Sequence, residues 1–154
     1  MIREVEGSTD GTGLHIGLAA ARWNQSITDR LLAGALARCQ EIGVDQVTVM
    51  RVPGALELPL AVRELARSGC DAVVAIATVI RGETDHYEVV VGESARGVGQ
   101  AALETGVPIA NAILAVHEYA HAVERAGPGE SNKGTEGVDA AVMTVTALRE
   151  LNGT

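Results

Sequence analysis

The sequence predicts a three-layer α/β fold, in which a parallel sheet has helices on both faces. Short apolar runs alternate with longer segments of helical period along the chain, as in successive strand–helix–strand units. One run, Asp71–Ile80, is rich in Val, Ile and Ala without alternation, which is typical of a strand buried on both faces. The chain has 154 residues, 47% of them hydrophobic, which suits one domain with one core. The expected architecture is a flavodoxin-like sandwich with a four-stranded parallel sheet.

The first strand and helix are predicted from residues 14–43. The apolar run Leu14–Ala20 predicts the strand. A helical period follows it, and Gly43 ends the helix. The buried face of this helix is expected to comprise Ile27, Leu31, Ala35, Leu36 and Cys39.

The second strand and helix follow directly. Gln46–Val52 predicts a strand, and the chain turns at Pro53 and Gly54. Pro59 fits the first turn of a helix that continues to about Arg67, because proline is tolerated at that position.

The third and fourth strands enclose a long helix. Asp71–Ile80 is expected to be the central strand of the sheet. The helix after it is predicted to open at Glu83 or Thr84 and to end near Thr105, and Val107–Val116 contains the fourth strand.

Two helices complete the chain. The first is predicted from about Glu118 to Arg125, and the sequence Gly127–Gly129, with Pro128 at its centre, interrupts it. The apolar face of the last helix is expected to comprise Val138, Ala141, Val142, Val145 and Leu148.

The composition argues against two classes of protein. The chain has 12 basic and 20 acidic residues, one Trp, two Tyr and no Phe, so it lacks the basic face and the stacking platforms of nucleic-acid-binding proteins. The longest apolar run, Ala72–Ile80, is too short to cross a membrane, and the N-terminal residues lack a secretory pattern, so we expect no membrane partner and a cytoplasmic location. Cys39 and Cys70 are expected to be buried free thiols.

Polar and aromatic residues gather where the predicted strands end, which is where open parallel sheets bind ligands. Trp23, the only tryptophan, follows the first strand; it can stack on a flat ligand or pack as a partly buried core residue. Glu57 can bind hydroxyl groups or favour the start of its helix. Neither a Walker sequence nor a GxGxxG motif follows a strand, so nucleoside triphosphates and dinucleotides are not expected.

The loop after the third strand combines a candidate anion site with a candidate acid or base. Gly82, Glu83 and Thr84 open a helix, so their backbone N–H groups can hold a phosphate. His86, expected one turn into that helix, can exchange protons with a ligand there, because imidazole titrates near neutral pH. The alternative is a structural histidine.

A rival motif suggests zinc chemistry. His117 to His121 matches HExxH, in which two histidines on one helix bind zinc. Glu124 and Gly127 stand where the extended pattern has a glycine and a third histidine, and Glu136 and Glu150 remain as other third ligands. A zinc hydrolase is therefore the less favoured alternative, and no bound metal is expected.

Four motifs in fixed order and spacing resemble the lumazine synthase family of riboflavin biosynthesis, over residues 14–151. The motifs are Ala21-Arg22-Trp23-Asn24, Val52-Pro53-Gly54-Ala55-Leu56-Glu57-Leu58-Pro59, Val79-Ile80-Arg81-Gly82-Glu83-Thr84-Asp85-His86-Tyr87, and Glu124-Arg125-Ala126-Gly127 with Asn132-Lys133-Gly134.

The resemblance implies a cofactor-independent transferase. 5-Amino-6-(D-ribitylamino)uracil condenses with 3,4-dihydroxy-2-butanone 4-phosphate to give 6,7-dimethyl-8-ribityllumazine, phosphate and water. It further implies that Trp23 stacks on the pyrimidinedione and that His86 transfers protons. Other implied contacts with the ring and ribityl chain are Ala55, Leu56, Glu57, Thr78, Val79, Ile80, Asn111 and Lys133, and those with phosphate are Glu83, Thr84 and Arg125.

The sequence departs from the family pattern near the implied site. Asp85 stands where proline is usual, which adds a carboxylate beside the phosphate loop and is expected to weaken anion binding. Ile76-Ala77-Thr78 and Ala112–Ala115 also differ from the usual residues. His121 replaces a usual glutamine, which accounts for the HExxH match. A catalytically weakened paralogue that binds flavin or lumazine is therefore the first alternative.

The resemblance also implies a homo-oligomer. The family forms pentameric rings, some of which pack into hollow sixty-subunit shells, and an adjacent subunit contributes the residues that match Asn111, Arg125 and Lys133. Residues 1–13 are expected to form an arm, whose alternating Ile2–Glu6 suits an edge strand on a neighbour, and 14–151 a single domain. The short connection Pro128–Ser131 favours a shell, and riboflavin synthase is a further expected partner.

Overall fold

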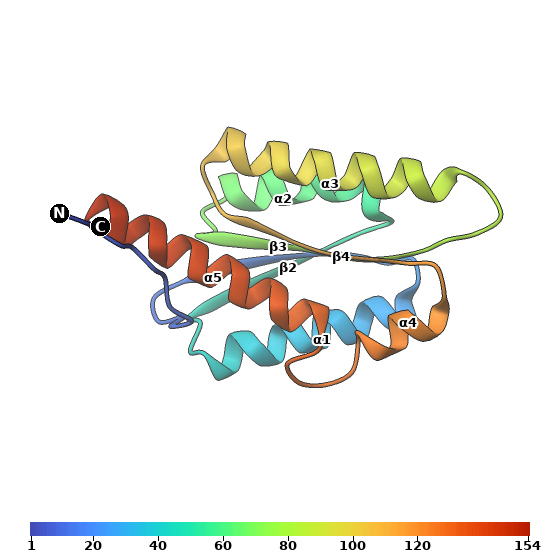
Figure 1. Ribbon diagram of the computed structural model, residues 1–154, viewed down its shortest axis with the longest axis horizontal. Helices are drawn as coiled ribbons and strands as arrows, with labels where there is room; N and C mark the ends of the chain where they lie inside the picture. The colour runs from blue at the N-terminus through green and yellow to red at the C-terminus, as the bar shows by residue number, and fades with distance from the viewer.

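The computed structural model describes residues 1–154 and has the predicted three-layer α/β architecture (Figure 1). Its four strands are β1 (His15–Ala21), β2 (Gln46–Val52), β3 (Ala72–Ile80) and β4 (Ile109–Val116), in the order β2-β1-β3-β4. Every pair of neighbouring strands is parallel. β3 lies between β1 and β4 and its first seven residues are buried, so the prediction of a central strand is confirmed.

Helices cover both faces of the sheet (Figure 1). One face packs against α2 (Leu58–Arg67) and α3 (His86–Thr105). The other packs against α1 (Gln25–Glu41), α4 (Tyr119–Glu124) and α5 (Lys133–Asn152). A short 3₁₀ helix, Ala55–Glu57, precedes α2 and was not predicted. None of the helices is long and apolar enough to span a membrane.

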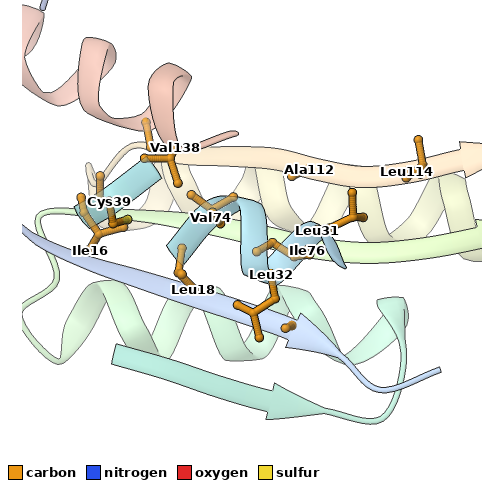
Figure 2. Close-up of a cluster of buried hydrophobic side chains, with 14 of the residues drawn as sticks. Ile16, Leu18, Leu31, Leu32, Cys39, Val74, Ile76, Ala112, Leu114 and Val138 are labelled. Atoms are coloured by element: carbon orange, nitrogen blue, oxygen red, sulfur yellow. The ribbon is translucent and has the colours of Figure 1, made fainter. Parts of the chain in front are cut away.

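Two apolar clusters hold the layers together, because successive side chains of a strand point to opposite faces. Ile16 and Leu18 of β1 point towards α1 and α5, whereas Ala19 points towards α2 and α3. Figure 2 shows the first cluster, in which Val74 and Ile76 of β3 lie among side chains of α1 and α5.

Two predicted core residues are instead partly exposed. Leu36 of α1 and Leu148 of α5 each have an exposed fraction of 39%. Leu36 lies at the edge of the buried face, and Leu32, one turn earlier, is the leucine that enters the core. Leu148 belongs to the C-terminal turns of α5, which extend beyond the sheet (Figure 1).

Both cysteines are free and buried, as predicted. Cys39 belongs to the cluster between the sheet and α1, and burial raises the pKa of its thiol to about 11. Burial also raises the pKa of the Cys70 thiol. Both side chains therefore stay protonated and unreactive at neutral pH.

The first ten residues form no helix or strand and run along α5. The Arg3 guanidinium donates to the Glu150 carbonyl (3.1 Å), and the Ser8 N–H donates to Thr146 Oγ1 (2.9 Å). Gly7 is required there, because a Cβ at this position would lie 1.8 Å from the Met143 carbonyl oxygen. Within one chain, the arm is thus bound to its own last helix.

Candidate active site

A pocket of about 190 Å³ opens at the carboxyl ends of β1, β2 and β3, next to the start of α3. This is the sheet edge at which the sequence predicted a ligand site. Seven predicted site residues line it: Trp23, Ala55, Leu56, Thr78, Val79, Ile80 and His86. The structure therefore brings together side chains from β1, β3, α3 and the 3₁₀ helix that precedes α2.

A larger depression, of about 940 Å³, lies between α1 and the connection from α4 to α5. None of the predicted site residues lines it. The smaller pocket is the better candidate, because it lies at the carboxyl ends of the strands and contains an exposed tryptophan and a histidine, whereas the larger one lies between helices away from the strand ends.

Trp23 forms an exposed wall of the pocket. Its backbone N–H donates to the Pro53 carbonyl (3.0 Å), and the residue has an exposed fraction of 65%. The ring lies against Gly54, where a Cβ would come within 2.5 Å of an indole carbon. The exposed indole can therefore stack on a flat ligand, and the reading of Trp23 as a partly buried core residue is wrong.

The segment after Trp23 is tied to the end of β3. Asn24 is the only non-glycine residue with a positive φ (57°), and its amide Nδ2 donates to the Thr78 carbonyl (2.7 Å). Thr28 lies near the start of α1, and its hydroxyl is within donating distance of two acceptors, the Trp23 carbonyl oxygen (3.2 Å) and Thr78 Oγ1 (3.1 Å).

The second post-strand loop contributes the 3₁₀ helix at the pocket edge. Ala55 is buried, and Leu56 is 44% exposed. Glu57 Oε2 accepts a hydrogen bond from the Gly54 N–H at 3.2 Å, which stabilises the loop. The other carboxylate oxygen of the exposed Glu57 can bind ligand hydroxyl groups at the rim.

The phosphate-loop candidate precedes α3 rather than opening it. α3 begins at His86, so Glu83 and Thr84 lie in bends outside the helix, and His86 is its first residue rather than one turn inside it. Asp85 occupies the N-cap position without a capping hydrogen bond from its side chain. The first turn of α3 closes where the Glu88 N–H donates to the Asp85 carbonyl (3.2 Å). His86 still lines the pocket, beside the exposed N–H groups of the loop.

Arg81 supplies the cation nearest to this loop in sequence. Its backbone N–H donates to the Val116 carbonyl (2.9 Å). Its guanidinium forms an ion pair with the Glu88 carboxylate (2.5 Å) and lies over the Tyr87 ring, 5.7 Å from the ring centroid. The loop is therefore anchored to β4 on one side and to α3 on the other.

Six predicted site residues do not line the pocket: Glu57, Glu83 and Thr84 lie in the adjoining post-strand segments, and Asn111, Arg125 and Lys133 lie elsewhere on the chain. Asn111 is exposed on β4, where its Oδ1 accepts from the Ile113 N–H (2.9 Å). Arg125 directly follows α4, and its guanidinium donates to the His121 carbonyl (3.0 Å). Lys133 is the first residue of α5, and its ammonium nitrogen lies 3.7 Å from a carboxylate oxygen of Glu136. A single chain thus assembles only part of the predicted set.

The zinc-protease geometry is absent. α4 begins at Tyr119, so His117 lies before the helix and does not share a helix face with His121. The His117 ring instead packs edge-on against Tyr87, with centroids 5.6 Å apart. No cluster of three His, Cys, Asp or Glu side chains has the arrangement of a metal site. The HExxH interpretation is therefore wrong.

Sequence reasoning missed four lining residues: Ala21, Asn24, Gly54 and Val90. Val90 stands four residues after His86 on α3, so helical spacing could have paired them. Asn24 follows the candidate stacking residue, and asparagine is the non-glycine residue that most readily adopts a left-handed backbone. That signal was present in the sequence.

Comparisons with known proteins agree on one family. A family model described as 6,7-dimethyl-8-ribityllumazine synthase matches residues 13–149. A protein of that name from Kineococcus radiotolerans is 48% identical over 146 residues, which cover 94% of this chain and 91% of the relative. Relatives with the same name from Thermococcus gammatolerans (41% identical) and Nitratidesulfovibrio vulgaris (40%) cover 97% of this chain, and 97% and 98% of their own lengths.

Proposed function

Because the chain belongs to the 6,7-dimethyl-8-ribityllumazine synthase family, we propose that its strand-end pocket makes 6,7-dimethyl-8-ribityllumazine in riboflavin biosynthesis. The substrates are 5-amino-6-(D-ribitylamino)uracil and 3,4-dihydroxy-2-butanone 4-phosphate, and phosphate and water are released. The observation that supports this most is the coincidence of the family match with a pocket lined by an exposed tryptophan and a histidine.

The proposed pyrimidine subsite uses the exposed indole and the strand ends. Trp23 stacks on the pyrimidinedione, and the backbone of Thr78, Val79 and Ile80 borders the ring. The ribityl hydroxyls face Glu57, whose free carboxylate oxygen can accept their protons in hydrogen bonds. Ala55 and Leu56 complete this side of the pocket.

The proposed phosphate subsite is the loop at Glu83 and Thr84. Its exposed backbone N–H groups and the positive end of the α3 dipole attract an anion, whereas the carboxylates of Glu83 and Asp85 oppose it. A cation is therefore needed for tight binding. Arg125 of an adjacent subunit is the residue that we assign to this role.

His86 is the proposed acid and base. The condensation requires proton transfers as the amine adds to the carbonyl, water and phosphate leave, and the second ring closes. Lining the pocket beside the phosphate loop, the imidazole can serve these steps, which typically gain about 10² to 10⁴ in rate. Holding two substrates in one pocket supplies the larger part of the acceleration.

We further propose a ring of subunits with shared sites. Asn111, Arg125 and Lys133 lie outside the pocket of their own chain, so a head-to-tail contact can deliver them to the pocket of a neighbour. A pentamer, or a sixty-subunit shell built from such pentamers, is the expected assembly. The arm of residues 1–13 then leaves α5 and adds an edge strand to a neighbouring sheet.

Co-expression of two impaired variants, assayed at a concentration of the phosphate substrate at which each variant alone gives little product, tests the shared site. His86→Ala removes the acid or base and Arg125→Ala the neighbour's cation, so a mixed ring contains some sites with both native groups. Random mixing is expected to restore about one quarter of the native activity. No recovery in rings that contain both variants would contradict a shared site.

The cellular setting follows from the chemistry. The product has one new ring and no phosphate, so an enzyme that consumes lumazine, such as riboflavin synthase, is the proposed partner. We place the reaction in the cytoplasm, which the two buried free thiols support.

The direct test mixes the purified protein with both substrates and records the lumazine chromophore. We expect product only when both substrates are present, and undiminished activity with a chelator. Tight binding of lumazine without its formation would indicate the weakened paralogue instead.

A further inference from the structure

We propose that Asn24 and Thr28 are positioning residues that hold the indole of Trp23 at a fixed angle to the end of β3, and thereby set the affinity for the pyrimidine substrate. This inference rests on the proposed function for the identity of the ligand. Neither residue needs to touch that ligand to act in this way.

The indole needs such support because packing does not provide it. Trp23 is 65% exposed, and its ring lies close to Gly54. A side chain with so few neighbours keeps a defined orientation only if its backbone is fixed. The main chain of Trp23 is held at both of its polar groups: the N–H donates to the Pro53 carbonyl and the carbonyl lies 3.2 Å from Thr28 Oγ1.

Asn24 fixes the direction in which the chain leaves Trp23. Its backbone adopts φ 57° and ψ 44°, a left-handed conformation that is unfavourable for most side chains and is tolerated by asparagine. The amide offsets this cost by donating to the Thr78 carbonyl at 2.7 Å, across to the end of β3. The left-handed residue therefore joins two strand ends that both border the pocket.

Thr28 provides the second connection, and its hydroxyl is fully buried. The Thr28 hydroxyl is the donor in both of its contacts, to the Trp23 carbonyl at 3.2 Å and to Thr78 Oγ1 at 3.1 Å, so its single proton is shared between two acceptors. Thr28 therefore links the backbone of Trp23 to the Thr78 side chain on β3.

Two variants separate these connections. Thr28→Val has nearly the same shape but no hydroxyl, which leaves the buried Thr78 hydroxyl and the Trp23 carbonyl without their partner. Asn24→Gly keeps the left-handed backbone at an exposed position and removes only the amide. Thr28→Ser restores the hydroxyl. Thr144→Val is the matched control, because it removes a 2.7 Å bond from a hydroxyl to Ala140 on the exposed side of α5.

Trp23 is the only tryptophan, so fluorescence reports on this side chain alone. For Thr28→Val and Asn24→Gly we expect a larger nanosecond wobble of the indole in the time-resolved anisotropy of the unliganded protein. With both substrates present, the KM for the pyrimidine is expected to rise about 10-fold, since one buried bond is lost, while the KM for the phosphate substrate stays within about twofold. Thr28→Ser and Thr144→Val are expected to match the native protein in both measurements.

Three results would overturn the proposal: an unchanged indole wobble in both variants, an equal rise of the two KM values, or failure of Thr28→Ser to restore the native values. The anisotropy is measured without substrate, so it tests the positioning role even if the protein does not make lumazine. Absence of product from the native protein, with the wobble changed as expected, would refute the proposed function and leave the structural role standing.

Discussion

Gly54→Ala directly displaces the stacking residue. A Cβ at position 54 would lie 2.5 and 2.6 Å from two indole carbons of Trp23. Carbon atoms in contact prefer about 3.5–4.0 Å, so the ring has to move by about 1 Å. The Gly54 backbone is extended (φ −141°, ψ −177°), a conformation that alanine adopts without strain.

The displacement should alter catalysis far more than folding. Since Trp23 is 65% exposed, its ring can shift into solvent with little loss of packing, and we expect the free energy of unfolding to change by less than about 1 kcal/mol. A misplacement of about 1 Å can reduce catalytic efficiency by about 100-fold. We therefore expect kcat/KM for the pyrimidine to fall by up to about 100-fold in Gly54→Ala.

The assay varies the pyrimidine at a saturating concentration of the phosphate substrate and follows the lumazine absorbance. Gly99→Ala is the matched control, because a Cβ there meets no atom within 4 Å. The stacking role would be refuted if Gly54→Ala kept the native kcat/KM while its tryptophan emission showed that the ring had moved.

Four further substitutions or conditions test other parts of the account. His86→Ala should slow product formation by about 10- to 10,000-fold without loss of folding, and unchanged turnover would make His86 structural. Arg125→Ala should raise the KM for the phosphate substrate far more than that for the pyrimidine, because guanidinium groups bind phosphate through charge-assisted bonds; equal losses would argue against this role. Asn132→Ala should lower the free energy of unfolding in urea by about 2–4 kcal/mol, because the buried amide caps α5 and bonds two carbonyls; a loss below about 1 kcal/mol would contradict this. Folding raises the pKa of Cys39 from 9.0 to about 11, so the native state keeps a proton that the unfolded chain loses, and stability should fall as the pH rises through this interval. Cys39→Ala should flatten that decline, and an equally steep decline in the variant would assign it to other groups.

Elements bounded by clear turn residues could be predicted from the sequence. Gln46–Val52 matches β2 at both ends, and the Pro59 signal fits α2, which begins one residue earlier at Leu58. The sequence predicts the start of α3 at Glu83 or Thr84, whereas the helix begins two or three residues later, at His86. Acidic and hydroxyl side chains are favoured at helix starts, so several neighbouring residues of these types give the same signal. The period of the hydrophobic residues predicts that a helix exists and which of its faces is buried. It is least informative for residues at the edge of that face, such as Leu36, which was predicted to be buried and is 39% exposed.

The candidate site was predictable in its location and less so in its construction. The rule for strand ends and the post-strand residues Trp23 and His86 located the pocket. The connections through Asn24 and Thr28 depend on contacts between residues about 50 positions apart, which no local pattern encodes. The HExxH match failed for the opposite reason: a local pattern was present, and the chain at His117 is not helical.

The central claim is that one pocket joins two substrates with loss of phosphate. The most direct measurement quantifies lumazine and inorganic phosphate in the same reaction of the native protein. The account predicts that both appear together in equal amounts, only when both substrates are supplied. Phosphate released from the butanone phosphate alone, or binding of both substrates without either product, would contradict it.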